Sequence, residues 1–468
     1  MRMNYQLLSL VLGCVLGVVT GCQEATSGRI GSPAVRSEEG ALPSPQHLVL
    51  ISIDTLRADH VGAYGSTVRT PHIDALAADG VRFSRAWPAA TTTLASHTSM
   101  LTGQLPHSHG VPLNGVIVDP QNTTLAEVLQ AQGFATIGVV GGTPMRASTG
   151  LGQGFDDYIG PQRPGSRGNQ TMLAAIDARP QERLFLFMHY WDAHWPYIAP
   201  EPWSRMYRTD DLPLRGTLDE IRALRRALSA GEPEAEASSA AMKGAYAGVV
   251  SYTDAHVGDF IAALKARDLY DDALIILTSD HGESTDEHWD HWTHGKSTYE
   301  SAVHVPLIIK LPDSTSAGRV IDTPVSLIDL FPTALALLDV PVAASVDGVS
   351  LAAALAGQPL SRGPIFVEAT APDRSDKING EYWINQENCA AILSGSDKLQ
   401  HCPWRKNSIE RFDLSTDPAE SHSRSDAADT DALHAQLQAA RSRVTPRRIV
   451  SEEGTDMAAA LQALGYVE

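Results

Sequence analysis

The chain has 468 residues, of which 43% are hydrophobic and 19% charged, and this balance excludes a disordered chain or a coiled coil. Its 36 Lys and Arg residues are outnumbered by 55 Asp and Glu residues, which gives a formal net charge of −19. We therefore expect no nucleic-acid partner, and an anionic ligand needs a local pocket built from a metal, a lysine or a helix N-terminus. Four cysteines are too few for a fold held together by disulfide bonds.

The N-terminus has the pattern of an export signal. An arginine precedes an apolar run at residues 7–19, which is long enough for a signal peptide but short for a membrane span. The run ends in Val19-Thr20-Gly21-Cys22, which resembles a bacterial lipobox, where a peptidase cuts before a lipid-modified cysteine. We expect a lipoprotein signal peptide at residues 1–21 and a flexible tether at residues 22–46. The protein would then be exported and lipid-anchored to the bacterial cell envelope through Cys22, in the periplasm or at the cell surface. An ordinary secretory signal with an incidental cysteine is the alternative.

Two cysteines remain after these two processing steps, Cys389 and Cys402. The stretch between them can form a β-hairpin around Gly395 and Ser396, a glycine-first pair that suits a type II′ turn. In that register the two cysteines face each other at a non-hydrogen-bonded position, where Cα atoms are close enough for a disulfide bond. We predict this bond, and two unrelated buried thiols are the alternative.

Apolar runs alternate with helical patterns along most of the chain. Residues 47–54, 184–189 and 273–280 are continuous apolar runs, typical of strands buried on both faces of a parallel sheet. Helical patterns occur at residues 72–79, 124–132 and 241–267, and residues 205–239 are expected to form a solvated helical excursion. The alternation predicts an α/β fold with a mostly parallel sheet flanked by helices and functional residues at the carboxyl ends of the strands.

The character of the sequence changes near residue 373. Short alternating strands are expected at residues 389–393, 398–402 and 411–414, followed by a helix at residues 431–443. We therefore expect a catalytic domain at residues 47–372. A small C-terminal antiparallel sheet subdomain with the terminal helices would occupy residues 373–468.

Two of the apolar strands end in an acid. Asp54 closes the first strand, and Asp280 closes a later one and is followed by His281. If the two strands are neighbours, two carboxylates and an imidazole meet at one edge of the sheet, which is a donor set suited to a metal ion. Taken alone, each aspartate is more typical of a turn.

A cluster of hydroxyl groups begins at Thr91 and runs into a helical pattern that ends at Gly103. A helix N-terminus offers unpaired N–H groups and a positive potential, which suit an oxyanion ester or a hydroxyl nucleophile. A threonine N-cap without a chemical role is the alternative.

Six stretches between residues 46 and 414 resemble, in the same order, the sulfatase branch of the alkaline-phosphatase superfamily. They are LVLISIDTLRADHVGAYG, TPHIDALAADGVRF, TLASHTSMLTGQLPHSHGV, HYWDAHWPY, LTSDHGE and HGKSTYE. The resemblance implies a doubly wound α/β domain with a small C-terminal sheet domain. It also implies a metal-assisted nucleophile that attacks a sulfate or phosphate ester.

The chain departs from this family at the nucleophile. Sulfatases carry Cys/Ser-x-Pro-x-Arg ahead of Leu-Thr-Gly, and the matching positions here are Thr93, Ala95 and His97. The sulfatase nucleophile is formylglycine, an aldehyde made by oxidising Cys or Ser, and threonine cannot yield it because its β-carbon carries a methyl group. The resemblance therefore implies that Thr93 acts directly as an alkoxide and forms a phosphothreonine. A pocket element of the family, Gly-Lys-Trp-His, corresponds to residues 140–143, which contain neither Lys nor His.

The resemblance assigns roles to the other motif residues. It implies one divalent metal ion held by two carboxylates, an imidazole and an alkoxide, with Mn²⁺ or Zn²⁺ favoured and Ca²⁺ or Mg²⁺ as alternatives: Asp54, Asp280, His281 and Thr93. His194 matches a histidine that contacts the ester or its leaving group, and Lys296 matches a lysine that binds the anionic substrate. His294 is a candidate general acid, ahead of His288. His97 would contact the phosphoryl group or orient the nucleophile.

Other residues near these motifs are open to two interpretations. Structural roles are expected for three histidines: His107, His109 and His189. A second metal near Asp192 and His194 is an alternative that the spacing alone does not support. Four tryptophans either line a pocket for a sugar or aryl leaving group or pack in the core: Trp191, Trp195, Trp289 and Trp292.

These observations predict a metal-dependent hydrolase of the sulfatase family that cleaves phosphate or phosphonate esters through Thr93. Its partner would be a small anionic ester, linked to a glycan or a lipid. The alternatives are sulfate-ester hydrolysis, an envelope phosphotransferase that passes the Thr93-bound group to a glycan or lipid, and a binding lipoprotein without activity. The retained charged set argues against a pure binding protein, because a scaffold does not need it.

Overall fold

The structure of the protein is a computed structural model that describes residues 42–208, 214–342, 345–369, 388–424 and 430–443. The expected signal peptide, Cys22 and most of the tether lie outside the described residues, as does the expected domain boundary at residues 372–373. The described residues, from Leu42 to Arg443, belong to one compact unit. Within the described part of the chain, no helix combines the length and the apolar character needed to cross a membrane.

A nine-stranded sheet forms the centre of this unit, in the order β4-β3-β5-β1-β6-β7-β2-β8, with β9 paired to β2. The strands are β1 (His47–Ile53), β2 (Val81–Trp87), β3 (Phe134–Val140), β4 (Asp157–Ile159), β5 (Arg183–Tyr190), β6 (Ala273–Ser279), β7 (Val305–Lys310), β8 (Val320–Ile321) and β9 (Val325–Ser326). Only β7 runs antiparallel to its neighbours, β6 and β2. The predicted mostly parallel sheet is therefore confirmed.

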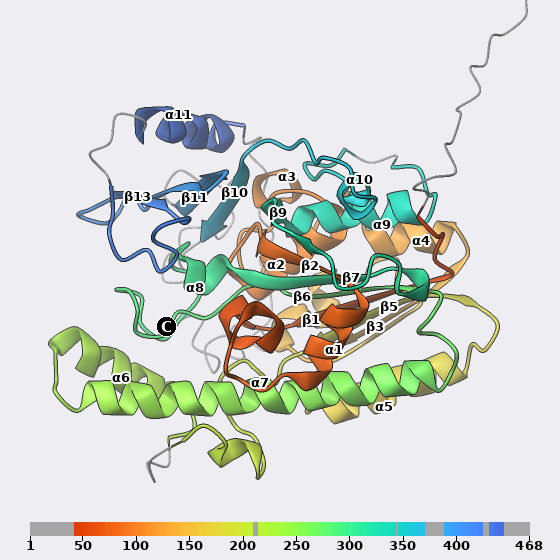
Figure 1. Ribbon diagram of the computed structural model, residues 1–468, viewed down its shortest axis with the longest axis horizontal. Helices are drawn as coiled ribbons and strands as arrows, with labels where there is room; N and C mark the ends of the chain where they lie inside the picture. Colours follow the sequence, from red (N-terminus) through yellow and green to blue (C-terminus); the bar gives the residue numbers. More distant parts are fainter. Residues whose placement is uncertain (1–41, 209–213, 343–344, 370–387, 425–429, 444–468) are drawn as a thin grey trace, which may run out of the picture. The chain divides into compact units, whose positions relative to one another are not determined.

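Helices cover both faces of the sheet (Figure 1). One face carries α1 (Pro71–Asp79), α5 (Gly165–Asp177) and α7 (Ala235–Lys265), and the other carries α2 (Thr93–Thr102), α4 (Leu125–Ala131) and α9 (Leu330–Leu337). The first strand shows why its sequence is apolar throughout. Leu48 and Leu50 pack into the core on the α2 side, and Val49 and Ile51 pack into the core on the α7 side.

The predicted helices are present with small shifts at their ends, and α7 begins six residues before the predicted start at residue 241. The expected helical excursion contains α6 (Leu218–Ala230), which begins with a capping box between Thr217 and Glu220. The described part also contains three short α-helices: α3 (Pro106–His109), α8 (Glu300–Val303) and α10 (Ala352–Leu355).

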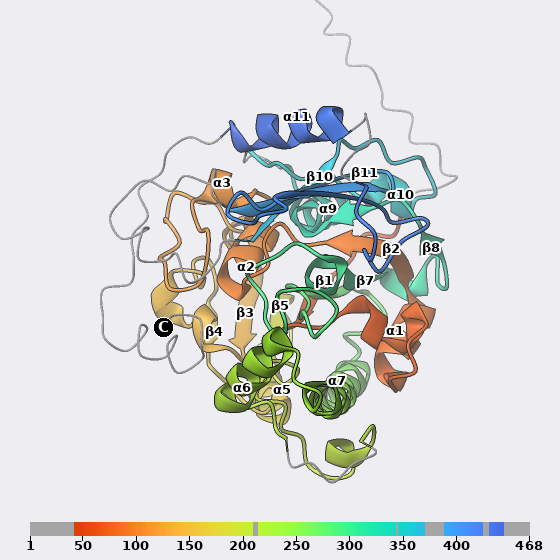
Figure 2. The same cartoon turned by 90° about the vertical axis from the view of Figure 1, so that its left-hand side faces the viewer.

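A second, four-stranded antiparallel sheet follows the central one, in the order β10-β11-β12-β13. Its strands are β10 (Ile365–Ala369), β11 (Cys389–Ser394), β12 (Asp397–His401) and β13 (Ile409–Asp413), and α11 (Thr430–Arg441) packs on its outer face (Figure 2). The β11–β12 hairpin turns at Gly395 in the predicted register. The predicted disulfide bond between Cys389 and Cys402 is confirmed, with the two Cα atoms 4.0 Å apart.

The small sheet is joined to the segment that precedes the proposed nucleophile. Ala90 forms an isolated parallel bridge with Glu368 of β10. The Thr91 N–H donates to the Glu368 carbonyl at 3.3 Å, and the Glu368 N–H donates to the Ala89 carbonyl at 3.0 Å. The first strand of the small sheet therefore holds the backbone that leads into α2.

Candidate active site at the carboxyl edge of the sheet

The carboxyl ends of β5, β1 and β6 meet at one edge because β1 lies between the other two in parallel register. Ile53 is level with Tyr190 on one side and with Ser279 on the other, so Asp54 and Asp280 leave the sheet side by side. Asp54, Asp280 and His281 are fully buried, and their ligand atoms lie within 4.8 Å of one another. The expected meeting of two carboxylates and an imidazole is present.

Hydrogen bonds with the backbone orient the side chains of Asp280 and His281, which together with Asp54 we call the trio. The remaining polar atoms of these side chains lie close to one another. The Asp280 Oδ1 atom accepts hydrogen bonds from the Thr55 and His281 N–H groups, at 3.2 and 3.0 Å. The His281 Nδ1 atom donates to the Gly282 carbonyl at 2.9 Å, so its Nε2 atom carries a lone pair. Each residue of the trio then has one buried atom without a hydrogen-bond partner in the described part of the chain: Asp54 Oδ1, Asp280 Oδ2 and His281 Nε2.

Buried polar atoms are rarely left unpaired, and a cation bound between these three would satisfy all of them. Burial, followed by repulsion from Asp280, raises the pKa of Asp54 well above its ordinary value. Burial also opposes the ionisation of Asp280, yet the neighbouring rings of His281, His97 and His189 hold its pKa below its ordinary value. A divalent cation would keep both carboxylates ionised, so the trio fits a metal ion.

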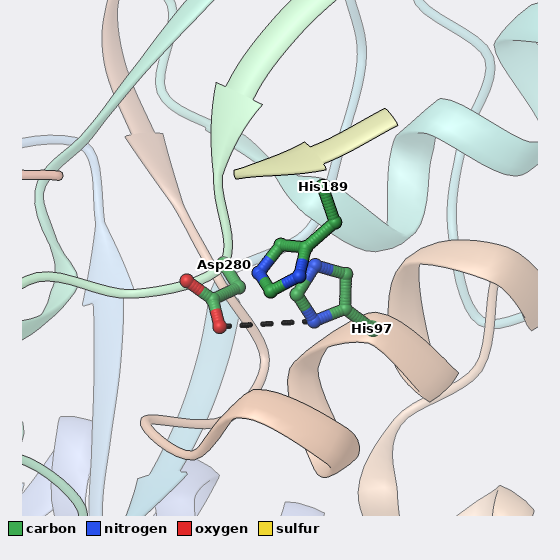
Figure 3. Close-up of side chains that lie close together, drawn as sticks. All are labelled: His97, His189 and Asp280. Atoms are coloured by element: carbon green, nitrogen blue, oxygen red, sulfur yellow. Dashed lines mark ion pairs between the residues drawn. The ribbon is translucent and has the colours of Figure 1, made fainter. Parts of the chain in front are cut away.

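His97, His189 and Asp280 form a second cluster beside the first (Figure 3). The His97 Nδ1 atom lies 2.7 Å from the Thr93 carbonyl, which can only accept, so this nitrogen carries the hydrogen. The His97 Nε2 atom accepts from the Ser52 hydroxyl at 2.9 Å. Burial lowers the pKa of His97 to about 3, so the ring is neutral. Both nitrogens bond to the protein, one of them to the Thr93 carbonyl, which favours the expected role of orienting the nucleophile over a contact with the phosphoryl group.

His189 lies inside the site, although the sequence favoured a structural role for it. The Gly141 N–H points at its Nδ1 atom at 3.4 Å, which leaves the hydrogen on Nε2. The Nε2 atom lies 3.4 Å from Asp54 Oδ2, so this N–H faces a carboxylate of the trio. His189 is therefore suited to orienting Asp54 rather than to binding a metal itself.

Thr93 is the first residue of α2, and its side chain is fully buried. Its Oγ1 atom lies 3.4 Å from Asp54 Oδ2. The Asn114 carboxamide accepts from the Leu94 N–H at 2.7 Å, and the Ser96 hydroxyl donates to the Asp280 carbonyl at 2.7 Å. These contacts hold the N-terminus of the helix, with its positive potential, against the buried carboxylates.

A row of aromatic rings leads away from the trio. The ring centroid of His281 lies 4.6 Å from that of His294, which lies 5.2 Å from that of His194. The His194 ring stacks on the Trp191 indole at 3.9 Å. The structure therefore brings His194 and His294 together beside the candidate metal ligands.

The two histidines differ in their partners. The His294 Nδ1 atom faces the carboxylate of Glu283 at 3.2 Å, and Glu283 is fully buried. The His194 Nδ1 atom donates to the Trp195 carbonyl at 2.6 Å. Burial, and then the neighbouring His294 ring, lowers the pKa of His194 well below its ordinary value. His294, with a carboxylate behind it, is the better proton donor of the two.

Lys296 lies on the same loop as His294 and is half-buried. Within the described chain, its ammonium group has no hydrogen bond or ion pair, and no contact with the trio is found. His288 stacks on Tyr299 at 3.7 Å and so faces the small sheet rather than the trio.

The tryptophans divide between core and site. Trp292 is fully buried and donates to the Ser239 hydroxyl at 2.9 Å, and Trp195 packs in the core beneath it. Trp191 fills the space above two glycines, because a Cβ atom on Gly142 would lie 2.2 Å from its ring. The tryptophan therefore packs directly against Gly141 and Gly142, within the segment at residues 140–143.

Asp192 does not face His194. Its Oδ1 atom accepts from the Gly165 N–H at the start of α5, at 3.1 Å. Burial raises the pKa of Asp192, and the neighbouring charge that opposes this most is that of His256. The hypothesis of a second metal between Asp192 and His194 therefore has no support among the residues that the structure describes.

Three residues of the site were not predicted: Asn114, His189 and Glu283. Asn114 lies in a loop with no motif. Glu283 is part of a motif quoted above, but its contact with His294 depends on how the loop after β6 folds back on itself. His189 is the last residue but one of β5, and Asp54 directly follows β1. This shared position at the carboxyl end of a strand is the signal that could have identified His189.

Comparisons with known proteins agree with this geometry. A family model described as Sulfatase matches residues 46–340, and one described as N-sulphoglucosamine sulphohydrolase, C-terminal, matches residues 287–445. An arylsulfatase of Clostridium perfringens is 26% identical over an alignment of 447 residues. The alignment covers 80% of this chain and 89% of the relative.

Two solved structures have the same fold. A phosphonate monoester hydrolase of Agrobacterium radiobacter aligns with a TM-score of 0.65 at 22% identity, over 88% of this chain and 100% of the other. A protein solved in complex with its substrate D-glucosamine-2-N,6-O-disulfate aligns with a TM-score of 0.68 at 18% identity, over 86% and 98% of the two chains.

Proposed function

This chain belongs to the sulfatase family, and we propose that it hydrolyses phosphate or phosphonate esters with Thr93 as the nucleophile. Its relatives and structural neighbours are ester-hydrolysing enzymes, which makes this chain a hydrolase of the same superfamily. The observation that carries the finer proposal is the position of the Thr93 hydroxyl, 3.4 Å from Asp54 Oδ2 at the N-terminus of α2. A threonine cannot be oxidised to formylglycine, so the hydroxyl itself must attack.

The ligands of the metal would be Asp54, Asp280, His281 and the Thr93 oxygen. When bound, a divalent ion lowers the pKa of the hydroxyl and withdraws charge from the ester. Two carboxylates, an imidazole and an alkoxide favour Mn²⁺ or Zn²⁺, with Ca²⁺ and Mg²⁺ as alternatives. His189 would hold Asp54 in place through its Nε2–H group.

The reaction would proceed in two displacements. The Thr93 hydroxyl passes its proton to Asp54 Oδ2, and its oxygen forms a bond to phosphorus while the bond between phosphorus and the leaving-group oxygen breaks. That oxygen receives a proton from His294, which Glu283 orients. His294, now without that proton, takes one from a water molecule whose oxygen attacks the phosphothreonine. The bond between phosphorus and the Thr93 oxygen breaks, inorganic phosphate (or the free phosphonate) is released, and Asp54 returns the proton to the Thr93 oxygen. Lys296 and the N-H groups of α2 would bind the non-bridging oxygens.

The substrate would be a small anionic ester linked to a glycan or a lipid. A structural neighbour was solved with a doubly sulfated glucosamine as its substrate, and this favours a glycan over a lipid as the group linked to the ester. We also propose that lipid on Cys22 anchors the enzyme to the cell envelope, where both kinds of ester occur.

Sulfate-ester hydrolysis is the second candidate function. The family model and the arylsulfatase relative favour it. Thr93 favours phosphoryl transfer instead, because a threonine cannot be converted to the formylglycine with which sulfatases hydrolyse sulfate esters.

The test uses matched p-nitrophenyl esters of sulfate, phosphate, a phosphodiester and a phosphonate, with the enzyme loaded with Mn²⁺ or Zn²⁺. We expect turnover of the phosphorus esters, loss of that turnover in Thr93→Ala, and partial activity in Thr93→Ser, which keeps a hydroxyl. Sulfate turnover that survives in Thr93→Ala would show that the nucleophile is wrongly assigned. Metal binding without turnover of any ester would favour a transferase that lacks its acceptor, and absence of both would favour a binding lipoprotein.

A further inference from the structure

The row of rings that begins at His281 ends at Trp191, and the guanidinium group of Arg163 lies over that last ring. The guanidinium carbon of Arg163 lies 5.9 Å from the centroid of the Trp191 ring, whose stacking partner is His194. Arg163 is exposed, and no hydrogen bond or ion pair holds its guanidinium within the described chain. The contact between this cation and the ring therefore places the Arg163 charge next to Trp191, on the side of the row that is farthest from the candidate metal ligands.

The backbone around Arg163 is fixed at the same edge of the sheet as the site. The segment follows β4, and the Gln162 N–H donates to the Val140 carbonyl at the end of β3, at 2.8 Å. Three residues later, the Gly165 N–H donates to Asp192. Both anchors belong to the carboxyl edge, so the guanidinium is presented from a fixed loop rather than from a distant surface.

The electrostatics agree with this placement. Burial is the main cause of the low pKa of His194, and the charge of Arg163 is among the smaller causes, so its field reaches that ring. In a chain with a net charge of −19, an exposed arginine without an acidic hydrogen-bond partner is a local attraction for anions. The Trp191 Nε1 atom, on a side chain that is 3% exposed, also has no partner among the described residues.

We propose that Arg163, held over Trp191, binds a second anionic group on the leaving-group side of the substrate. This inference rests on the proposed function, because it takes the trio as the site of the reacting ester and His194 and His294 as neighbours of the leaving group. The preferred substrate is then an ester whose sugar or aryl leaving group carries a carboxylate, sulfate or phosphate of its own. The planar guanidinium can bind such a group with two parallel hydrogen bonds.

The test compares phenyl phosphate with 3-carboxyphenyl phosphate, together with the matching pair of sulfate esters, on the metal-loaded full chain. We expect Arg163→Gln to lower kcat/KM for the carboxylated ester by about fivefold to tenfold while leaving the neutral ester within about twofold. Arg163→Lys, which keeps the charge, should restore part of the loss. Raising the salt concentration should reduce the preference in the wild type, because an exposed charge pair is screened.

Arg167→Gln is the matched control, because Arg167 is an exposed arginine on the first turn of α5, four residues along the chain. It should leave both esters unchanged. Turnover of both esters with the same ratio in the wild type and in Arg163→Gln would overturn this inference and leave the proposed function standing. Absence of turnover with all four esters would overturn the proposed function and the inference with it.

Discussion

At the scale of single residues, the chemistry depends on which nitrogen of each histidine carries a hydrogen. His281 donates from Nδ1 and leaves a lone pair on Nε2, whereas His97 uses both of its nitrogens within the protein. His189 presents an N–H to Asp54. We therefore propose three different roles for these three buried histidines: metal ligand for His281, support of the helix for His97 and support of the carboxylate for His189.

These roles predict different metal contents for three substitutions. We expect His281→Gln to abolish stoichiometric metal binding, since it removes a ligand, and His189→Gln to weaken binding by about tenfold, since it removes a partner of Asp54. His97→Gln should retain the metal and lower the stability of the fold instead. Elemental analysis by mass spectrometry, with a competing chelator to rank affinity, measures all three.

His109→Gln is the control, because His109 is buried in the same way but contacts Ser99 and Val111 away from the trio. It should keep full metal content. Loss of metal in His97→Gln, with metal retained in His281→Gln, would reverse the assignment of ligands.

At the scale of elements, β10 links the small sheet to the nucleophile segment through Glu368. The backbone of Glu368 bonds to Ala89 and Thr91, and its buried carboxyl accepts from the Asn388 side chain at 3.3 Å. Burial raises the pKa of this carboxyl to about 8, although Asn388 and the charge of Arg441 on α11 act in the opposite direction. Glu368 is therefore protonated in the folded protein at neutral pH.

This pKa predicts a pH-dependent stability. The ordinary pKa of a glutamate is 4.5, so between about pH 4.5 and 8 the folded state holds a proton that the unfolded state has lost. The contribution of Glu368 to the free energy of unfolding is thus complete below pH 4.5 and falls as pH rises through this window. We expect Glu368→Gln to be more stable than the wild type at pH 8.5, by about 1–3 kcal/mol, and close to it at pH 4.5.

Urea unfolding at the two pH values measures this difference. Glu232→Gln, at an exposed position, is the control and should change neither value. An equal effect of Glu368→Gln at both pH values would mean that the carboxyl does not titrate in this window.

The elements also show how far the sequence alone can lead. The three long apolar runs predicted β1, β5 and β6 to within a residue or two, because strands buried on both faces must be apolar throughout. The hairpin register followed from a single glycine at the turn, and it placed Cys389 opposite Cys402 correctly. By contrast, the bridge between Glu368 and Ala90 joins residues far apart in sequence, and no local pattern indicates it.

The same distinction holds within the site. Asp54, Asp280 and His281 could be predicted to converge because each follows a strand of one parallel sheet, and such ends share an edge. The contact of Glu283 with His294 and the tautomers of His97 and His189 could not. They depend on backbone donors and acceptors from other segments, which the fold alone brings into place.

At the scale of the whole molecule, we propose that processing at Cys22 decides where the enzyme works. Cys22 ends the apolar run that resembles a signal peptide, whereas Cys14 lies inside it. Expressed at full length in a bacterium with a lipoprotein pathway, the protein should incorporate a labelled fatty acid and lose residues 1–21, and Cys22→Ser should do neither. Cys14→Ser, the matched control, should do both. Absence of the label from the wild type, or cleavage after residue 21 that survives in Cys22→Ser, would contradict the lipid anchor.

Because the whole molecule is strongly acidic, an anionic substrate can be attracted only by cations within the site. With a net charge of −19, the surface as a whole repels an anionic ester, so binding must come from the site itself. The metal, Lys296 and Arg163 are the candidates for this attraction. The central claim about the site, however, concerns the threonine that forms the covalent bond.

The most direct test of that claim is to measure, during turnover, the mass of the peptide that contains Thr93. The metal-loaded enzyme is mixed with a phosphate ester, quenched in acid within the first turnovers, digested and examined by mass spectrometry. The account predicts one added phosphoryl group on the peptide that contains Thr93, localised to that residue and lost when turnover is allowed to finish. Steady turnover with a phosphoryl group trapped on another residue, or an undiminished rate in Thr93→Ala, would contradict it.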